Sequence, residues 1–315
     1  MINECFSAYC LLHTAYSFLC ASVSLWLMLF NMISRLPQWL IKKSRDNSKL
    51  HAVKSILREK GLNTVCESAR CPNIAECFSK PTATFMILGD VCTRRCGFCS
   101  VEKGYPLQPS DDEPVKIAEV SAKLSLRHVV ITSVTRDDLP DKGSWQFVRT
   151  INEVRRLNNG ITVEVLTPDF SGSVKSIRMV AEKKPEIYNH NIETVPRLYK
   201  KVRPQADYKR SLELLKLVKE FYPAIITKSG MMVGLGEEKD EVIDVMKELR
   251  NIGCDVLTIG QYLMPTKNNL PVIEYVEPEV FEFYKQEGEK IGFKSVESGP
   301  FVRSSYNARM INNKF

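Results

Sequence analysis

Charged residues are missing from a long stretch near the start of this 315-residue chain: no Asp, Glu, Lys or Arg occurs between Cys5 and Ser34. A charge-free apolar run of this length can enter a bilayer. The run lacks the basic start of a signal peptide and the Arg-rich character of a mitochondrial transit peptide, which argues against both. Two expectations are left: translation starts at Met32, which is the favoured one, or residues 1–34 form a membrane-associated hydrophobic extension.

The sequence also lacks the features of a disordered or nucleic-acid-binding protein. Apolar residues make up 44% of the chain and charged residues 26%, which suits one large folded domain with extensions. The net charge of +7 comes without a basic low-complexity tail. Basic residues crowd the stretch 197–210, but only Tyr199 and Tyr208 offer aromatic surfaces there. We therefore expect no nucleic-acid partner, and the excess of positive charge fits either a solvated surface or docking to an acidic partner.

Cysteine, in contrast, is abundant, with ten in the chain. A disulfide framework suits short secreted chains, whereas six of these cysteines form two tight triplets in an enzyme-sized sequence. Clustered, odd-numbered cysteines favour metal ligation in a reducing compartment, so a cytoplasmic location is expected. The first triplet is Cys66, Cys71 and Cys77, and the second triplet is Cys92, Cys96 and Cys99.

The second triplet reads CTRRCGFC at 92–99, a CxxxCxxC pattern. Three thiolates on one short loop can hold three irons of a cubane cluster and leave the fourth open, as a catalytic metal site requires. A zinc site would need a further Cys or His at comparable spacing, and His128 and His190 lie in predicted strands away from the loop. The spacing resembles that of the radical SAM enzymes. The resemblance implies that the open iron binds S-adenosylmethionine, which is cleaved to a 5′-deoxyadenosyl radical.

Short apolar strands alternate with amphipathic helices from residue 84 onward. The expected strands are 84–88, 129–133, 162–166, 187–189, 225–228 and 256–260. Helical periodicity predicts a helix that begins at Ser211 as its N-cap and others that end at Gly61 and Gly253. Alternation of this kind predicts a parallel sheet, and six units are fewer than a complete barrel needs. The expected fold class is α/β, a partial (β/α)6 TIM-type barrel of the radical SAM type.

Four segments are expected along the chain. The hydrophobic extension at 1–34 is followed by an N-terminal extension with the first triplet at 35–83, the barrel at 84–290 and a C-terminal extension at 291–315. Because the second triplet follows the first strand, we place it at the carboxyl edge of the sheet, where βα loops build active sites.

The first triplet decides which radical SAM enzyme the chain is similar to. By itself it fits a packing cluster, half a zinc knuckle or the ligands of an auxiliary cluster. The sequence CESARCPNIAEC at 66–77 looks like the auxiliary-cluster motif of lipoyl synthases, and RSSYNA at 303–308 matches that family's C-terminal signature. Blocks at 132–140, 190–199 and 261–266 agree. The resemblance covers nearly everything from Leu36 to Ala308.

This resemblance implies a sulfurtransferase with two 4Fe-4S clusters. In the family, a serine is the fourth ligand of the auxiliary cluster, which aligns with Ser305 rather than Ser304. The implied reaction inserts two sulfur atoms from that cluster at C6 and C8 of protein-bound octanoyl-lysine, completing the lipoyl cofactor. The implied partners are octanoylated lipoyl-carrier domains or the glycine-cleavage H protein, reduced flavodoxin or ferredoxin, and an iron–sulfur cluster carrier. The resemblance implies that the acidic carrier domain or H protein binds at Lys200 and Lys201.

Polar residues at strand ends are the candidates for binding S-adenosylmethionine. Glu164 would suit ribose hydroxyls, and Asn191 and Arg203 would suit the amino-acid end or the ribose. By analogy with the family, the candidates are Thr132, Ser133, Glu164, Asn191 and Arg203.

Two rival functions fit parts of the pattern. A methylthiotransferase acting on tRNA also pairs two clusters, but it would normally carry an RNA-binding β-barrel after the position of Ala308. An iron–sulfur electron carrier would need neither an open iron nor a barrel-sized scaffold.

Overall fold

The computed structural model describes residues 36–42, 48–80, 82–306 and 308. The chain divides into two units, Met1–Lys43 and Ser44–Phe315. The described part of the first unit contains a short 3₁₀ helix, η1, at Gln38–Leu40. The extension predicted at 1–34 lies outside the described residues. Among the residues that are described, no helix has the length and apolar character needed to cross a membrane.

The second unit is built on one sheet of seven parallel strands in the order β1-β4-β5-β6-β7-β8-β9. The strands are β1 (Thr82–Ile87), β4 (His128–Ser133), β5 (Thr162–Leu166), β6 (Ile187–Asn189), β7 (Ile226–Val233), β8 (Val256–Gln261) and β9 (Ser295–Gly299). All neighbouring strands run parallel, and within the described residues β1 and β9 have one neighbour each, so the barrel is open. Two further short strands, β2 (Val91–Cys92) and β3 (Glu102–Lys103), pair beside the sheet.

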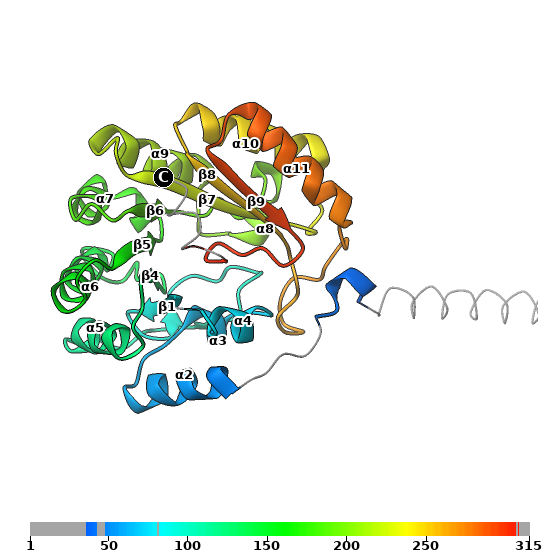
Figure 1. The fold of residues 1–315 in the computed structure, drawn as a ribbon. Helices are drawn as coiled ribbons and strands as arrows, with labels where there is room; N and C mark the ends of the chain where they lie inside the picture. The colour runs from blue at the N-terminus through cyan, green and yellow to red at the C-terminus, as the bar shows by residue number, and fades with distance from the viewer. Residues whose placement is uncertain (1–35, 43–47, 81, 307, 309–315) are drawn as a thin grey trace, which may run out of the picture. The chain divides into compact units, whose positions relative to one another are not determined.

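A helix follows nearly every strand and packs on the outside of the sheet (Figure 1). The crossover helices are α5 (Glu113–Lys123), α6 (Ser144–Leu157), α7 (Val174–Ala181), α9 (Tyr208–Phe221), α10 (Lys239–Asn251) and α11 (Pro278–Ile291). The other helices are α2 (Ser48–Glu59), α3 (Val65–Ser68), α4 (Ile74–Cys77), η2 (Phe170–Gly172), η3 (Pro196–Leu198) and α8 (Tyr199–Val202). Most strand residues are buried, because both faces of the sheet are covered.

The predicted partial barrel is confirmed, with one strand more than expected. Each of the six predicted strands is present, and β7 extends five residues further than predicted, to Val233. The additional strand, β9, comes from the segment that was predicted to be a C-terminal extension. Its sequence is SVESG, so it has only one strongly apolar residue, Val296, to signal a strand.

Helix boundaries follow from local hydrogen bonds. Helix α9 begins earlier than predicted, because the carboxylate of Asp207 accepts a hydrogen bond from the Arg210 N–H and caps the helix. Ser211 was therefore wrongly predicted as the cap, and its hydroxyl instead donates to the Asp207 carbonyl. The stop predicted at Gly253 agrees with the structure, where this residue has a φ of +86° just after α10.

Candidate active site

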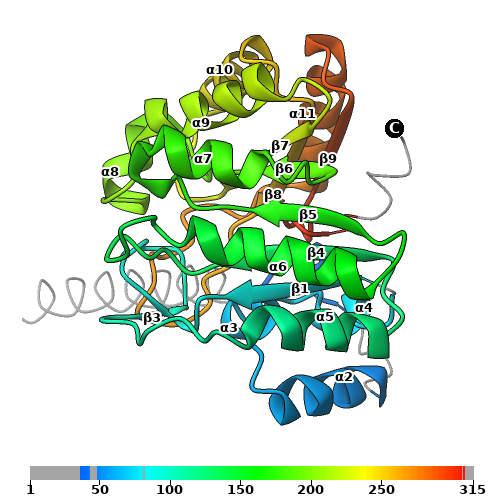
Figure 2. The ribbon, with the colours of Figure 1, turned by 90° about the vertical axis from the view of Figure 1, so that its left-hand side faces the viewer.

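A cavity of about 710 Å³ opens at the carboxyl edge of the sheet. All six cysteines of the two triplets line its wall, together with strand ends and the C-terminal segment. Parallel strands deliver their carboxyl ends to one edge of the sheet; β1 and β5 point the same way in Figure 2. The expected position of the second triplet at this edge agrees with the structure.

The second triplet begins at Cys92, the last residue of β2, and continues on the loop to β3. Neighbouring segments hold this loop in place. The Thr93 N–H donates to the Thr135 carbonyl at 3.1 Å, and the Gly97 N–H donates to the Val202 carbonyl at 2.9 Å. The Asn269 amide donates to the carbonyl of Cys99 at 2.9 Å. These bonds fix the backbone of the loop from three sides.

A buried arginine anchors the same loop from within. Arg94 donates to both carboxylate oxygens of Asp137, at 2.6 and 3.0 Å, and to Asp169 at 2.5 Å. Burial alone would raise the pKa of Asp169, but the hydrogen bond and the charge of Arg94 outweigh it and lower this pKa to about 2. Asp169 is therefore ionised at neutral pH. We refer to Arg94, Asp137 and Asp169 as the arginine clamp.

The first triplet lies on α3, α4 and the turn between them. Thr64 caps α3 by accepting from the Glu67 N–H, and the Cys71 N–H donates to the Cys66 carbonyl at 2.9 Å. The hydroxyl of Ser100, beside the second triplet, donates to the Ser68 carbonyl at 2.6 Å. The two cysteine-bearing segments are thus directly connected.

The C-terminal segment is tied to the first triplet by two hydrogen bonds. The amide of Asn73 donates to the Phe301 carbonyl at 2.6 Å, and the hydroxyl of Tyr306 donates to Glu76 at 2.9 Å. We call these two bonds the C-terminal latch. They join residues more than 200 positions apart in the sequence.

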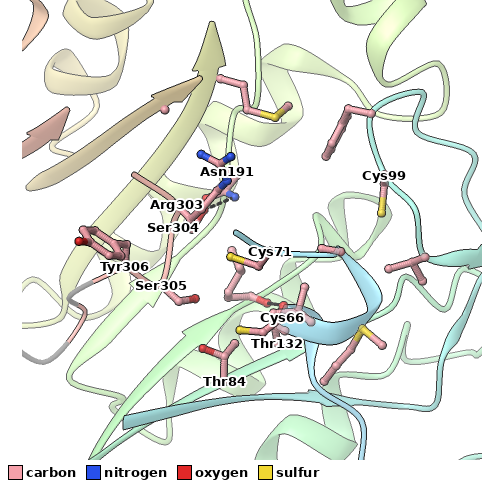
Figure 3. A pocket seen from close by; sticks show the side chains of 18 of the residues that line it. Cys66, Cys71, Thr84, Cys99, Thr132, Asn191, Arg303, Ser304, Ser305 and Tyr306 are labelled. Atoms are coloured by element: carbon pink, nitrogen blue, oxygen red, sulfur yellow. Dashed lines mark hydrogen bonds between the residues drawn. The ribbon is translucent and has the colours of Figure 1, made fainter. Parts of the chain in front are cut away.

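The side chains of Cys66, Cys71 and Ser305 point toward one shared space (Figure 3). Ser304 has a different environment, because its hydroxyl accepts a hydrogen bond from the Asn191 amide at 2.6 Å. Ser305 is thus the serine that faces the first triplet, and its role as the fourth ligand stays a prediction.

The cysteines of both triplets are partly buried. Burial raises the pKa of Cys99 to about 12, and a hydrogen bond with Cys71, together with burial, raises the pKa of Cys66. Cys66 and Cys99 are therefore protonated without metal, and metal ligation by these two residues must release protons. The backbone N–H groups of Arg94 and Thr135 donate hydrogen bonds to the sulfur of Cys92 at 3.4 and 3.3 Å.

The donor set fits iron–sulfur clusters. Among the described residues, no three His, Cys, Asp or Glu side chains meet as ligands of one metal ion, and the cysteines instead line the wall of a roomy cavity. A cubane places each thiolate on a separate iron, so its ligands are spread in this way.

Four of the five residues predicted to bind S-adenosylmethionine line the cavity: Thr132, Ser133, Asn191 and Arg203. Polar atoms of three of them have no partner within the described structure, although they are buried. These atoms are Ser133 Oγ, Asn191 Oδ1 and Arg203 Nε. Buried polar atoms normally have a partner, so these groups are ready to bind a polar ligand.

Glu164 does not line the cavity, so the structure does not support its predicted contact with ribose. Leu166, two residues further along β5, is the residue that lines the wall. Glu164 is fully buried one layer below, where it accepts hydrogen bonds from Lys228 at 2.9 Å and Asn189 at 3.2 Å. Its position inside a strand, rather than at the strand's end, accounts for the difference.

His190 was predicted to lie away from the second triplet, but it lines the same cavity. Its Nδ1 lies 2.8 Å from the Thr167 carbonyl, which can only accept, so Nδ1 carries the proton. Burial, reinforced by the charge of Arg203, lowers the pKa of His190 to about 4. The imidazole is therefore neutral. Its position directly after β6, next to Asn191, could have indicated this place from the sequence.

Comparisons with known proteins agree with this geometry. Residues 86–249 match the model of the radical SAM superfamily. The chain is 57% identical over 277 residues to a lipoyl synthase from Caldanaerobacter subterraneus subsp. tengcongensis, covering 88% of this chain and 97% of that protein. It is 55% identical to a lipoyl synthase from Alkaliphilus metalliredigens, covering 88% of this chain and 95% of that one.

Solved structures share the fold at low identity. Methylornithine synthase (PylB) is 12% identical with a TM-score of 0.50, covering 81% of this chain and 83% of that one. Coproporphyrinogen III oxidase (HemN) from Escherichia coli is 11% identical with a TM-score of 0.51, covering 68% of this chain and 53% of that one. The fold, the six cavity cysteines and the sequence identity lead to one assignment: the chain belongs to the lipoyl synthase family of radical SAM enzymes.

Proposed function

We propose that this chain inserts two sulfur atoms, at C6 and C8, into an octanoyl group carried in amide linkage on a lysine of another protein. The observation that carries the proposal is that both cysteine triplets line one cavity, so a hydrogen-abstracting cofactor and a sulfur source would face the same substrate chain. Membership of the lipoyl synthase family, at 57% identity to one member, supports the same activity.

The two triplets have separate proposed roles. The second triplet would bind the cluster that holds S-adenosylmethionine, and the first triplet with Ser305 would bind the auxiliary cluster. When bound, these groups supply the 5′-deoxyadenosyl radical and the sulfur. The arginine clamp and the C-terminal latch would hold the cysteine-bearing segments in place around them.

The polar residues of the cavity wall would bind S-adenosylmethionine, and the apolar residues would contact the octanoyl chain. Thr132, Ser133, Asn191 and Arg203 would bind S-adenosylmethionine, and the unpartnered atoms of the last three support this role. An octanoyl chain needs an apolar wall. That wall would include Met231, Met232, Leu263, Met264 and Val302.

The proposed partners follow from this chemistry. The acyl group would arrive on a lipoyl-carrier domain or H protein, electrons from reduced flavodoxin or ferredoxin, and replacement clusters from an iron–sulfur carrier. A cytoplasmic location belongs to the same proposal, since reduced thiols persist there.

The decisive experiment is mass spectrometry of an octanoylated lipoyl-domain peptide after anaerobic incubation with the reconstituted protein, S-adenosylmethionine and a strong reductant. We expect the peptide to gain two sulfur atoms, with a further loss of two hydrogens once the dithiol oxidises, while two molecules of 5′-deoxyadenosine form. If 5′-deoxyadenosine forms and the peptide mass does not change, the proposed substrate is wrong. The second triplet's role would still stand in that case.

A further inference from the structure

Four exposed cations surround the loop of the second triplet: Arg95, Lys200, Lys201 and Lys267. We call them the loop-flanking basic patch. They belong to three segments that are far apart in the sequence. In Figure 2, the elements that carry the patch lie near one edge of the sheet. They are α8, the chain after β8 and the loop before β3.

Hydrogen bonds hold these three segments together at Gly97. The Gly97 N–H donates to the Val202 carbonyl at 2.9 Å, next to Lys201, and the Gly97 carbonyl accepts from the Leu270 N–H at 3.0 Å. The Arg95 N–H donates to the side chain of Gln205 at 2.6 Å. The four cations therefore lie in segments that are fixed to the loop itself.

The three segments that carry the patch contain few carboxylates of their own. Residues 91–101 and 262–273 contain no Asp or Glu. In 194–210 the only carboxylate is that of Asp207, which caps α9. Within the described part of the chain, no ion pair is formed by any of the four cations, whereas Arg197 and Arg210, in the same stretch as Lys200, pair with Glu241 and Asp169. Uncompensated exposed charge of one sign attracts a partner of the opposite sign.

The patch is separate from the cavity wall. None of its four members lines the cavity, whereas Cys92, Cys96 and Cys99 do. Arg95 is exposed to solvent although it is adjacent in sequence to Cys96. A protein that binds this patch would contact the loop of the second triplet from outside the cavity, without entering the space for the acyl chain.

We infer that the loop-flanking basic patch is the docking surface for an acidic one-electron donor protein. The inference rests on the proposed role of the second triplet in holding a redox-active cluster. In the step that it serves, the donor loses one electron and the cluster gains it, with no bond made or broken in the protein. This inference replaces the expectation that the acyl carrier binds at Lys200 and Lys201, because the carrier must deliver its acyl group to the cavity.

The test compares two pairs of charge reversals. Lys200→Glu/Lys201→Glu alters the patch, and Lys183→Glu/Lys184→Glu alters a second pair of adjacent lysines, located between α7 and β6 at the opposite edge of the sheet. Flavodoxin serves as the probe, and its flavin fluorescence reports binding to the reconstituted protein. The rate of cluster reduction is then followed by absorbance, with reduced flavodoxin and separately with titanium(III) citrate.

We expect the patch variant to bind flavodoxin about tenfold more weakly at low ionic strength, with the difference shrinking as salt is added, and to be reduced by it correspondingly more slowly. Reduction by titanium(III) citrate and the affinity for an octanoylated carrier domain should not change, and the control pair should behave like the unaltered protein. Unchanged flavodoxin binding overturns the inference, as does a loss of carrier affinity with flavodoxin binding intact. If titanium(III) citrate reduces no cluster in the unaltered protein, the proposed role of the second triplet is what fails.

Discussion

At the scale of single residues, Ser304 and Ser305 are neighbours with different surroundings. Asn191 donates to Ser304 at 2.6 Å, whereas Ser305 points toward the same space as Cys66 and Cys71 (Figure 3). We therefore predict that Ser305→Ala weakens the hold on the auxiliary cluster and that Ser304→Ala does not. Iron release to a chelator should be at least about tenfold faster in Ser305→Ala.

The measurement is made in a background whose second triplet is replaced by alanine, so that one cluster alone is followed. Ser304→Ala is the matched control. Equal release rates from the two variants would contradict the assignment of Ser305.

Because His190 is buried, we predict that the free energy of unfolding depends on pH. Burial lowers its pKa from the ordinary 6.5 to about 4, so the unfolded chain binds a proton there more readily than the folded one. Stability from this source is complete above pH 6.5 and is lost as the pH falls toward 4. The loss amounts to at most about 3 kcal/mol in the free energy of unfolding.

Urea unfolding of the cluster-free protein between pH 7 and about 4 tests this prediction. His190→Gln should flatten the pH dependence, and His51→Gln, at an exposed histidine of α2, should not. The pKa of Asp169 is lowered from 3.8 to about 2, so its own contribution to stability is lost mainly below pH 4, at the acid end of this range. A His190→Gln curve parallel to that of the unaltered protein would rule out the buried, neutral imidazole.

At the scale of elements, the arginine clamp joins the loop of the second triplet to the loops after β4 and β5. Arg94→Met leaves the buried carboxylate of Asp169 with the Ser171 N–H at 3.0 Å and, as its one remaining ion pair within the described residues, a 3.4 Å contact to Arg210. We predict a loss of about 3–5 kcal/mol in the free energy of unfolding, as is usual when a buried ion pair loses one member. The adjacent but exposed Arg95 provides the control, since Arg95→Met should change stability by less than about 0.5 kcal/mol. Similar losses in both variants, measured by urea unfolding, would be incompatible with the clamp.

The C-terminal latch acts on the segment that carries Ser305. Tyr306→Phe keeps the ring but removes the hydrogen bond to Glu76, which is worth about 1.5 kcal/mol when the acceptor is charged. We predict about tenfold faster iron release from the first triplet, measured as for Ser305→Ala. Tyr105→Phe, on a fully exposed tyrosine, is the control.

If the latch acts through this one bond, Glu76→Gln combined with Tyr306→Phe should add little to the single change. Additive effects of the two substitutions would show that they act separately.

Sequence patterns predicted the elements better than the contacts between them. The strands β4 to β8 have apolar, β-branched residues and were predicted within a few residues, whereas β9 was missed because most of its side chains are polar. The cysteine spacing predicted both triplets, and a family motif was needed for Ser305. The C-terminal latch joins Glu76 to Tyr306, and nothing in their local sequence indicates a contact across so many positions.

At the scale of the whole molecule, a buried charged network lies inside the barrel. It joins strands to one another, and its central residue, Glu164, does not line the cavity. Glu164 on β5 accepts from Lys228 on β7 and Asn189 on β6, and His128 on β4 lies 3.7 Å from its second oxygen. All four side chains are fully buried. Burial by itself would raise the pKa of Glu164, but the charge of Lys228 lowers it overall, so the carboxylate is ionised. The network therefore ties four strands together from within.

The last prediction distinguishes this supporting role from the ribose contact that the sequence suggested. Glu164→Gln removes the charge that Lys228 needs, and we predict a loss of about 3–5 kcal/mol in the free energy of unfolding. The affinity for S-adenosylmethionine, measured by equilibrium dialysis at a temperature where the variant is folded, should stay within about twofold, since the side chain does not line the cavity. Asn191→Ala should give the opposite pattern, with weaker binding and a smaller loss of stability, because its unpartnered Oδ1 belongs to the cavity wall. A large loss of affinity in Glu164→Gln without a loss of stability would place this carboxylate in the binding site after all.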